Sequence, residues 1–170
     1  MEKQCVLVTG GAGYIGSHTA VELIAAGYDV VIADDLSNSD LRAVEGVRRI
    51  TGVEVPFEQV DCCDREALGR LFRQYRFDSV IHFAASKAVG ESVHEPLKYY
   101  RNNLTSFLNV VELMRATGRP NIVFSSSCTV YGEADAQPVT ERTPRKPATS
   151  PYGNTKQMCE DVLRDAVAAY

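Results

Sequence analysis

Tyr152 and Lys156 are the residues whose types and spacing are best suited to chemistry. They lie four positions apart in S-P-Y-G-N-T-K, so on a helix both side chains share one face, one turn apart. A phenol ordinarily titrates near pH 10, and a phenolate base near pH 7 needs roughly 4 kcal/mol of stabilisation. A lysine ammonium about 6 Å away supplies on the order of 3 kcal/mol at an effective dielectric of 20. A second positive charge nearby would supply the remainder, so the pair predicts proton transfer at a substrate hydroxyl.

Ser127 is the third candidate for the same reaction. It follows a predicted strand at 121–126, whose apolar residues are Ile122, Val123 and Phe124, and its hydroxyl can hydrogen-bond the same substrate hydroxyl and pass on its proton. Tyr-x-x-x-Lys is common by chance, and its alternative interpretation is an exposed helix face. A serine at a strand end and a proline-capped helix start favour the catalytic interpretation.

A glycine-rich turn near the N-terminus predicts a binding site for a dinucleotide. Val6, Leu7 and Val8 form an apolar run that turns at once into glycines, followed by apolar residues at helical spacing. Four glycines lie in the turn: Gly10, Gly11, Gly13 and Gly16. Backbone N–H groups at a helix start can touch a pyrophosphate only where no Cβ stands between them. A nucleoside-triphosphate loop would need Gly-Lys-Ser/Thr, which this turn lacks.

Asp34 specifies the dinucleotide. It ends a second apolar run, 29–33, at the position where an acid accepts hydrogen bonds from the adenosine ribose. Its charge would repel a 2′-phosphate, and no Arg or Lys lies between Asp34 and Leu41. The sequence therefore predicts NAD as cofactor, not NADP.

The remaining pattern alternates strands with helices. It predicts strands at about 53–60, 78–84 and 121–126, and helices at about 41–51, 64–75, 96–117 and from Ser150 onward. Such alternation predicts an α/β fold with a doubly wound parallel sheet of order 3-2-1-4-5, Rossmann-like, as one NAD-binding domain over residues 1–170. Ligands in such sheets bind at the carboxyl ends of the strands, so we expect the candidate residues to meet there.

Charge, cysteine content and the length of the apolar runs indicate which classes of partner and which location to expect. The formal net charge of −4 gives no electrostatic reason to expect nucleic acid or an anionic membrane. The five cysteines lack metal-like spacing, so we expect thiols and no metal. The apolar runs break short of a membrane span and the start lacks a secretory signal, which predicts a cytoplasmic protein. His82 lies within an apolar strand and is expected in the core.

Several segments carry a family resemblance. T-G-G-A-G-Y-I-G at 9–16, S-S-S at 125–127, V-Y-G at 130–132 and Y-G-N-T-K at 152–156 resemble the extended short-chain dehydrogenase/reductases. H-F-A-A-S-K-A-V-G-E-S-V at 82–93 and Y-Y-R-N-N at 99–103 are similar to the UDP-glucose 4-epimerases of that family. The resemblance covers the whole chain. Asn154-Thr155 replaces the Lys-Ser common in the family, on other faces of the helix, where no effect is expected.

The resemblance implies roles for further residues. The implied cofactor contacts are Gly10, Gly13, Tyr14, Ile15, Gly16, Asp34, Asp35, Leu36, Ser37, Asn38, Ser39, Asp61, Cys62, Phe83, Ala84, Ala85, Ser86, Lys87, Asn102, Ser127, Tyr152 and Lys156. Ser127, Tyr152 and Lys156 fall on the family's catalytic positions, and the implied substrate contacts are Ser127, Cys128, Thr129 and Tyr152.

The resemblance also implies the reaction: NAD-dependent interconversion of UDP-glucose and UDP-galactose by C4 oxidation, rotation of the 4-keto sugar and re-reduction. It implies a homodimer through the helices at 96–117 and 150–170. The family calls for about as much sequence again, so we expect this chain to be the N-terminal portion of a longer enzyme, without its C-terminal substrate domain, and strand 121–126 to be an open apolar edge.

Three alternatives compete with this function. Related sugar dehydratases place Asp-Glu, and decarboxylases a Glu, just before Val-Tyr-Gly; this chain has Cys128 and Thr129 there, so it lacks the acid and base for elimination. An epimerase of UDP-pentoses or UDP-N-acetylhexosamines is the second alternative, decided by residues after Tyr170. The third is a non-catalytic NAD-binding module.

Overall fold

The computed structural model describes residues 3–119 and 121–170. The chain forms two compact units. The first comprises the residues up to Ala84 together with Leu108–Ser125, and the second comprises Ala85–Phe107 and Ser126–Tyr170. Helix α5 (Pro96–Ala116) begins in the second unit and ends in the first.

The first unit is built on a five-stranded sheet of order β3-β2-β1-β4-β5, in which every neighbouring pair is parallel. The strands are β1 (Cys5–Thr9), β2 (Asp29–Asp34), β3 (Phe57–Gln59), β4 (Ser79–His82) and β5 (Asn121–Phe124). The predicted strand order and parallel sheet are confirmed. β5 lies at one edge of the sheet, where Val123 is 60% exposed, as expected for an open edge.

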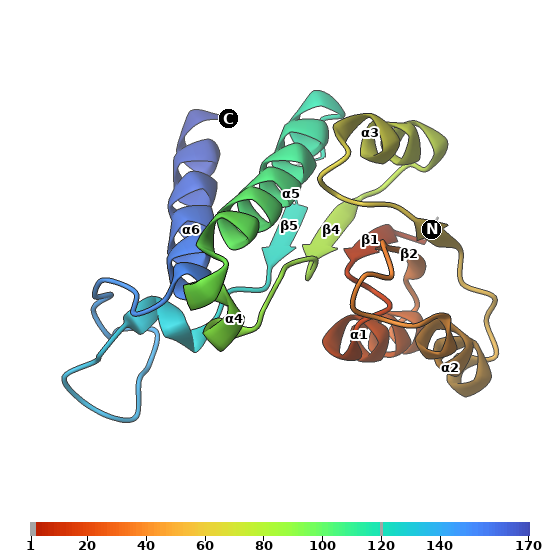
Figure 1. Ribbon diagram of the computed structural model, residues 1–170. Helices are drawn as coiled ribbons and strands as arrows, with labels where there is room; N and C mark the ends of the chain where they lie inside the picture. Colours follow the sequence, from red (N-terminus) through yellow and green to blue (C-terminus); the bar gives the residue numbers. More distant parts are fainter. Residues whose placement is uncertain (1–2, 120) are drawn as a thin grey trace. The chain divides into compact units, whose positions relative to one another are not determined.

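Helices pack on both faces of this sheet because its strands carry apolar side chains on both sides. Toward α1 (Tyr14–Ala25) and α2 (Leu41–Thr51), Val8, Ile32 and Val47 belong to one buried cluster. Toward α3 (Arg65–Gln74) and the end of α5, a second cluster contains Leu7, Leu68 and Val110. Figure 1 shows α1 and α2 on one side of the strands and α3 on the other, so the sheet is doubly wound.

Three strands are shorter than the sequence predicted. β3 pairs with β2 only over Phe57–Gln59, because Pro56 has no N–H and Val53 and Val55 precede the paired stretch. β4 ends at His82 instead of Ala84, and β5 ends at Phe124 instead of Ser126. The residues after these strands turn into loops that belong to the candidate site.

The second unit is helical. Besides the start of α5 it contains α4 (Val89–His94), the 3₁₀ helix η1 (Cys128–Tyr131) and α6 (Pro151–Ala169). The predicted start of α6 is confirmed: Ser150 accepts a hydrogen bond from the Gly153 N–H at 3.1 Å, and Pro151 lies in the first turn. α4 and η1 were not predicted, since both are too short to show a hydrophobic period.

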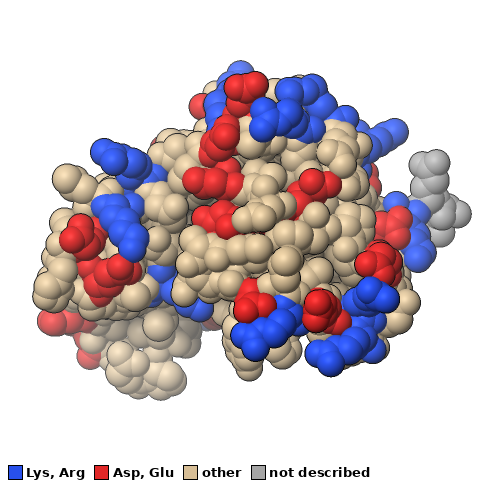
Figure 2. Space-filling view, turned by 45° about the vertical axis from the view of Figure 1, so that its right-hand side comes forward, with Lys and Arg blue, Asp and Glu red and all other residues tan. Residues whose placement is uncertain are grey.

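Acidic and basic side chains lie interspersed on the face of the molecule seen in Figure 2. Within residues 3–119 and 121–170, no helix is long and apolar enough to cross a membrane.

Candidate active site

The glycine turn joins β1 to α1 and is too crowded for side chains. A Cβ on Gly16 would lie 2.3 Å from the Gly10 carbonyl oxygen, and one on Gly10 would lie 2.7 Å from the Ala84 nitrogen. Gly10 also has φ +68°, a conformation that favours glycine. The turn therefore requires glycine for the close packing of its own backbone.

The first turn of α1 can hold an anion. Its N-cap, Gly13, offers no side-chain acceptor to the N–H groups of that turn, and the side chains of Tyr14 and Ile15 are 76% and 59% exposed. Unsatisfied N–H groups and the positive end of the helix dipole favour a negatively charged ligand. The residues at this turn therefore fit the pyrophosphate of a dinucleotide.

Asp34 lies beside this turn at the end of β2. It is 7% exposed, and its Oδ2 accepts a hydrogen bond from the Ala12 N–H at 3.0 Å. Its Oδ1 accepts from the Leu36 N–H at 3.0 Å and from the Ser39 hydroxyl at 2.6 Å. A carboxylate has about four acceptor positions, so one position is left for a ribose hydroxyl. A second ribose hydroxyl could bind only if the Ser39 hydroxyl turned away from Asp34.

The loop after Asp34 remains without an accessible cation. Asp35 Oδ1 accepts hydrogen bonds from the N–H and hydroxyl of Ser37, and Asn38 lies at the next position. The first cation after the loop, Arg42, pairs with Asp40 at 3.0 Å. The preference for a ribose without a 2′-phosphate therefore has support in the charges of this loop.

Asp61 and Cys62 follow β3, and their loop is held from α5. Asp61 Oδ1 accepts from the Cys63 N–H at 2.7 Å. The side-chain amide of Asn109 donates to the Cys62 and Cys63 carbonyls at 2.9 and 3.1 Å. Burial, with a smaller effect of Asp61, raises the pKa of the Cys62 thiol, so this thiol stays protonated and uncharged at neutral pH.

Phe83 and Ala84 complete the candidate residues of the first unit. The Phe83 N–H donates to the Thr9 carbonyl at 3.0 Å, and Ala84 lies against Gly10. The structure thus brings Gly10, Asp34 and Ala84 to the carboxyl ends of three strands, as the topology predicted. His82, expected in the core, is 1% exposed and its Nδ1 lies 2.8 Å from the Thr9 hydroxyl.

In the second unit, Ser86 lies between two asparagines of α5. Asn102, predicted beside the cofactor, donates to the Ser86 hydroxyl at 3.3 Å. Asn103, which the sequence analysis did not select, accepts from the Ser86 N–H at 2.8 Å and donates to its carbonyl at 3.0 Å. Ala85 is half-buried and Lys87 is exposed. Asn103 is thus the residue that fixes this loop.

Asn103 also reaches α6. Its side-chain amide donates to the Thr155 hydroxyl at 3.1 Å, and Asn154 donates to the Tyr100 hydroxyl at 2.7 Å. The pair Asn154-Thr155, which departs from the family pattern, therefore makes specific contacts with α5. No periodic signal in the sequence identifies Asn103. In the structure it is only 3% exposed, and a buried polar side chain of this kind usually has a hydrogen-bond partner.

Ser127 is the N-cap of η1. Its hydroxyl oxygen accepts from the Thr129 N–H at 3.3 Å and from the Thr129 hydroxyl at 2.9 Å, which leaves its own proton available to another acceptor. Cys128 is exposed beside it. A Cβ on Gly153 would lie 3.2 Å from Thr129, so the start of α6 packs closely on η1.

Tyr152 and Lys156 lie on one face of α6, as their spacing predicted. The Lys156 Nζ lies 5.9 Å from the centre of the Tyr152 ring. Lys156 is only 4% exposed, and its burial lowers its pKa from 10.5 to about 8. An ammonium with that pKa is still mostly charged at pH 7 and stabilises a neighbouring phenolate.

A family model described as GDP-mannose 4,6 dehydratase matches residues 7–170. The chain belongs to this family. Among its similar proteins is the UDP-glucose 4-epimerase of Bacillus subtilis (strain 168), 54% identical over 160 residues, which are 94% of this chain and 47% of the relative. The resemblance to UDP-glucose 4-epimerases is thereby confirmed, and the chain spans about half the length of the curated relatives it matches.

Two solved structures of nucleotide-sugar epimerases are similar to this chain over nearly its whole length. A UDP-glucose 4-epimerase from Bifidobacterium longum, in complex with NAD+ and UDP, is 46% identical with a TM-score of 0.96, over 98% of this chain and 50% of that one. A UDP-N-acetylglucosamine 4-epimerase from Methanobrevibacter ruminantium M1, in complex with UDP-N-acetylmuramic acid, is 32% identical with a TM-score of 0.86. The match covers 100% of this chain and 52% of that one.

Proposed function

We propose that the protein to which this chain belongs is an NAD-dependent isomerase that interconverts UDP-glucose and UDP-galactose. Residues 1–170 would be its NAD-binding Rossmann domain and carry its catalytic groups. The observation that carries this proposal is the Tyr152–Lys156 pair, one turn apart on α6, with the lysine buried and 5.9 Å from the phenol ring.

The chain's own residues have separate roles in this reaction. The glycine turn and α1 would bind the pyrophosphate of NAD, and Asp34 the adenosine ribose. Bound NAD supplies the acceptor, and afterwards the donor, of the hydride at sugar C4. Tyr152 takes the proton of the sugar 4-hydroxyl and later returns it to the same oxygen, after the 4-keto sugar has rotated to present its other face. Lys156 stabilises the phenolate, and Ser127 donates to the oxygen that loses and regains the proton.

Epimerisation is favoured over elimination by the residues next to Ser127. Elimination of water needs a further acid and base close to the reacting sugar, and η1 provides Cys128 and Thr129 at those positions. Neither side chain is a carboxylate, the group that the related dehydratases and decarboxylases place there. The family is named for a dehydratase, but this chain lacks the residues for dehydration.

UDP-glucose as the substrate is supported by the names of similar curated proteins, since the relatives from Bacillus subtilis (strain 168) and Mus musculus, 54% and 49% identical, are both UDP-glucose 4-epimerases.

The test is Tyr152→Phe in the intact protein, assayed for conversion of UDP-galactose to UDP-glucose. Loss of the acid–base group should lower kcat by about 10²- to 10⁴-fold, while NAD remains bound because the phenyl ring is kept. Tyr28→Phe, the same change in the loop before β2, is the matched control and should leave kcat unchanged. An active Tyr152→Phe protein would contradict the proposed role, and an intact protein that neither binds NAD nor converts UDP-sugars would contradict the function.

Assembly and location belong to the same proposal. We propose a cytoplasmic homodimer, in which α5 and α6 pair with their copies. Exposed apolar side chains on these helices, among them Leu97 and Val167 at 76% and 74% exposure, support such an interface. The free thiols of all five cysteines agree with a reducing compartment. Light scattering on the intact protein measures the oligomeric state.

A further inference from the structure

One face of α6 carries a third polar residue in line with the catalytic pair. Glu160 follows Tyr152 and Lys156 at the same four-residue interval, so the three side chains lie on neighbouring turns of one helix face. The Glu160 Oε1 accepts a hydrogen bond from the Ser126 hydroxyl at 2.5 Å. Ser126 is joined by a peptide bond to Ser127, so this contact ties the catalytic serine's segment to the helix that bears the catalytic tyrosine.

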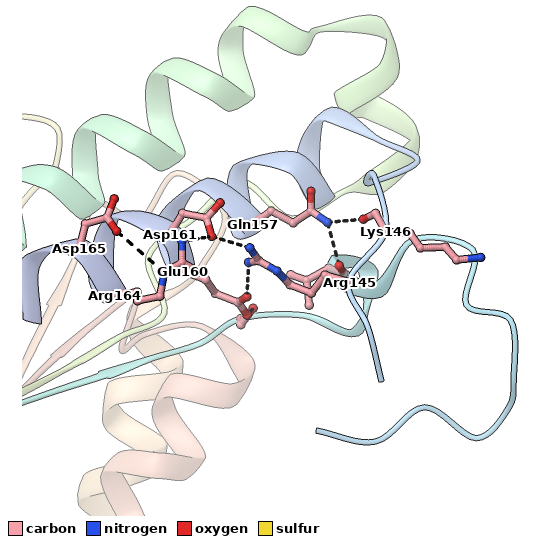
Figure 3. A network of polar contacts seen from close by, with 9 residues as sticks. Arg145, Lys146, Gln157, Glu160, Asp161, Arg164 and Asp165 are labelled. Carbon is pink, nitrogen blue, oxygen red and sulfur yellow. Dashed lines mark hydrogen bonds and ion pairs between the residues drawn. The ribbon is translucent and has the colours of Figure 1, made fainter. Parts of the chain in front are cut away.

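Arg145 holds the Glu160 carboxylate in place. Its Nη1 donates to the Glu160 Oε2 at 2.8 Å, and its Nη2 pairs with Asp161. Figure 3 shows the guanidinium reaching both carboxylates from the loop that precedes α6. The two carboxylates raise the pKa of Arg145, and Arg145 in turn lowers the pKa of Asp161. Paired contacts of this kind fix a carboxylate more firmly than one exposed ion pair.

The other end of the same segment is also held by α6. The Gln157 side-chain amide donates to the Val130 carbonyl at 2.8 Å and to the Lys146 carbonyl at 2.6 Å (Figure 3). Ser127 therefore lies between two attachments, Ser126 to Glu160 and Val130 to Gln157. Because proton transfer requires donor and acceptor within hydrogen-bond reach, small shifts of such a segment reduce turnover strongly.

We propose that Glu160, clamped by Arg145, is a positioning residue that sets the place of Ser127 relative to Tyr152 through the Ser126 hydroxyl. This role rests on the epimerase function proposed above. Glu160 acts through Ser126 and does not touch the substrate, so its loss should reduce kcat and leave KM nearly unchanged.

The experiment compares variants of the intact protein in the conversion of UDP-galactose to UDP-glucose. Glu160→Ala should lower kcat by about 10- to 100-fold with KM within about 3-fold. Glu160→Gln should recover only part of that loss, because its amide oxygen still accepts from Ser126 but its NH2 group cannot accept from Arg145 as Oε2 does. Ser126→Ala should match Glu160→Ala, and the double variant should be no slower than either single one, as expected for two residues acting through one contact.

Asp165→Asn is the matched control. It also removes a carboxylate charge from α6, but the Asp165 side chain is 79% exposed and lies 3.9 Å from Arg164. Its kcat should not change. If Glu160→Ala and Ser126→Ala leave kcat within about 2-fold, or if their effects multiply in the double variant, the positioning role is refuted.

Amide hydrogen exchange separates this role from the proposed function. In the intact protein, Glu160→Ala should speed exchange over residues 127–130, and Asp165→Asn should not. If the intact parent protein shows no epimerase turnover, the proposed function fails, and unchanged exchange in Glu160→Ala would then refute the positioning contact as well. Faster exchange confined to that segment supports it independently of turnover.

Discussion

Burial of Lys156 makes the stability of this chain depend on pH in a way that one substitution isolates. The group is 4% exposed, and its pKa falls from 10.5 to about 8 because burial disfavours the ammonium. Below pH 8 the lysine is protonated in both the folded and the unfolded chain, so the whole cost of burying the charge is present. The difference of 10.5 minus about 8, at ~1.4 kcal/mol per pKa unit, corresponds to roughly 3 kcal/mol.

The sign of the pH effect follows from proton counting. Between pH 8 and pH 10.5 the unfolded chain holds a proton on Lys156 that the folded chain has released. The free energy of unfolding therefore rises with pH across this window because of Lys156. Lys156→Met has no such group. The wild-type value minus the Lys156→Met value should thus increase by roughly 3 kcal/mol from below pH 8 to above pH 10.5.

Urea denaturation of both proteins at a series of pH values measures this difference, and most other titrating groups cancel. Cys159 does not cancel, since burial raises its pKa to about 11 with a smaller opposing effect of Lys156, and Tyr152 does not cancel, because its ring lies 5.9 Å from the Lys156 Nζ. The comparison is therefore repeated in a background that carries both Tyr152→Phe and Cys159→Ala. A difference that stays constant across the window would refute the conclusion that the ammonium is desolvated.

Three further substitutions test the unit that contains the glycine turn. Gly16→Ala places a Cβ 2.3 Å from the Gly10 carbonyl oxygen, so it should destabilise the chain and abolish NAD binding in calorimetry. Gly46→Ala in α2, where a Cβ has no atom within 4 Å, should stabilise the chain by about 0.5–1 kcal/mol. Equal effects of these two substitutions would contradict the conclusion that the turn is too crowded for a side chain. Asn109→Ala removes the amide that donates to the Cys62 and Cys63 carbonyls and should lower the free energy of unfolding by about 1–3 kcal/mol. Urea denaturation measures this change, and an unchanged midpoint would contradict it.

Elements specified by local sequence were predicted well. The glycine turn, the acid at the end of β2 and the helix start at Ser150 depend on residues within a few positions of one another, and the structure contains all three. Tyr152 and Lys156 share a face because helical geometry alone sets their spacing. The strand order follows from the alternation of strands and helices, since right-handed crossovers leave few arrangements.

The sequence determined which residue types could perform the chemistry, and the tertiary structure decided what holds them. The contacts that the sequence analysis missed join residues far apart in the chain: Asn103 to Ser86 across 17 positions, Ser126 to Glu160 across 34 and Asn109 to Cys62 across 47. A hydrogen-bonding side chain leaves no periodic trace of its partner, because donor and acceptor need only meet in space. The low pKa of Lys156 likewise depends on the atoms packed around it, and burial of that kind exists only once the chain has folded.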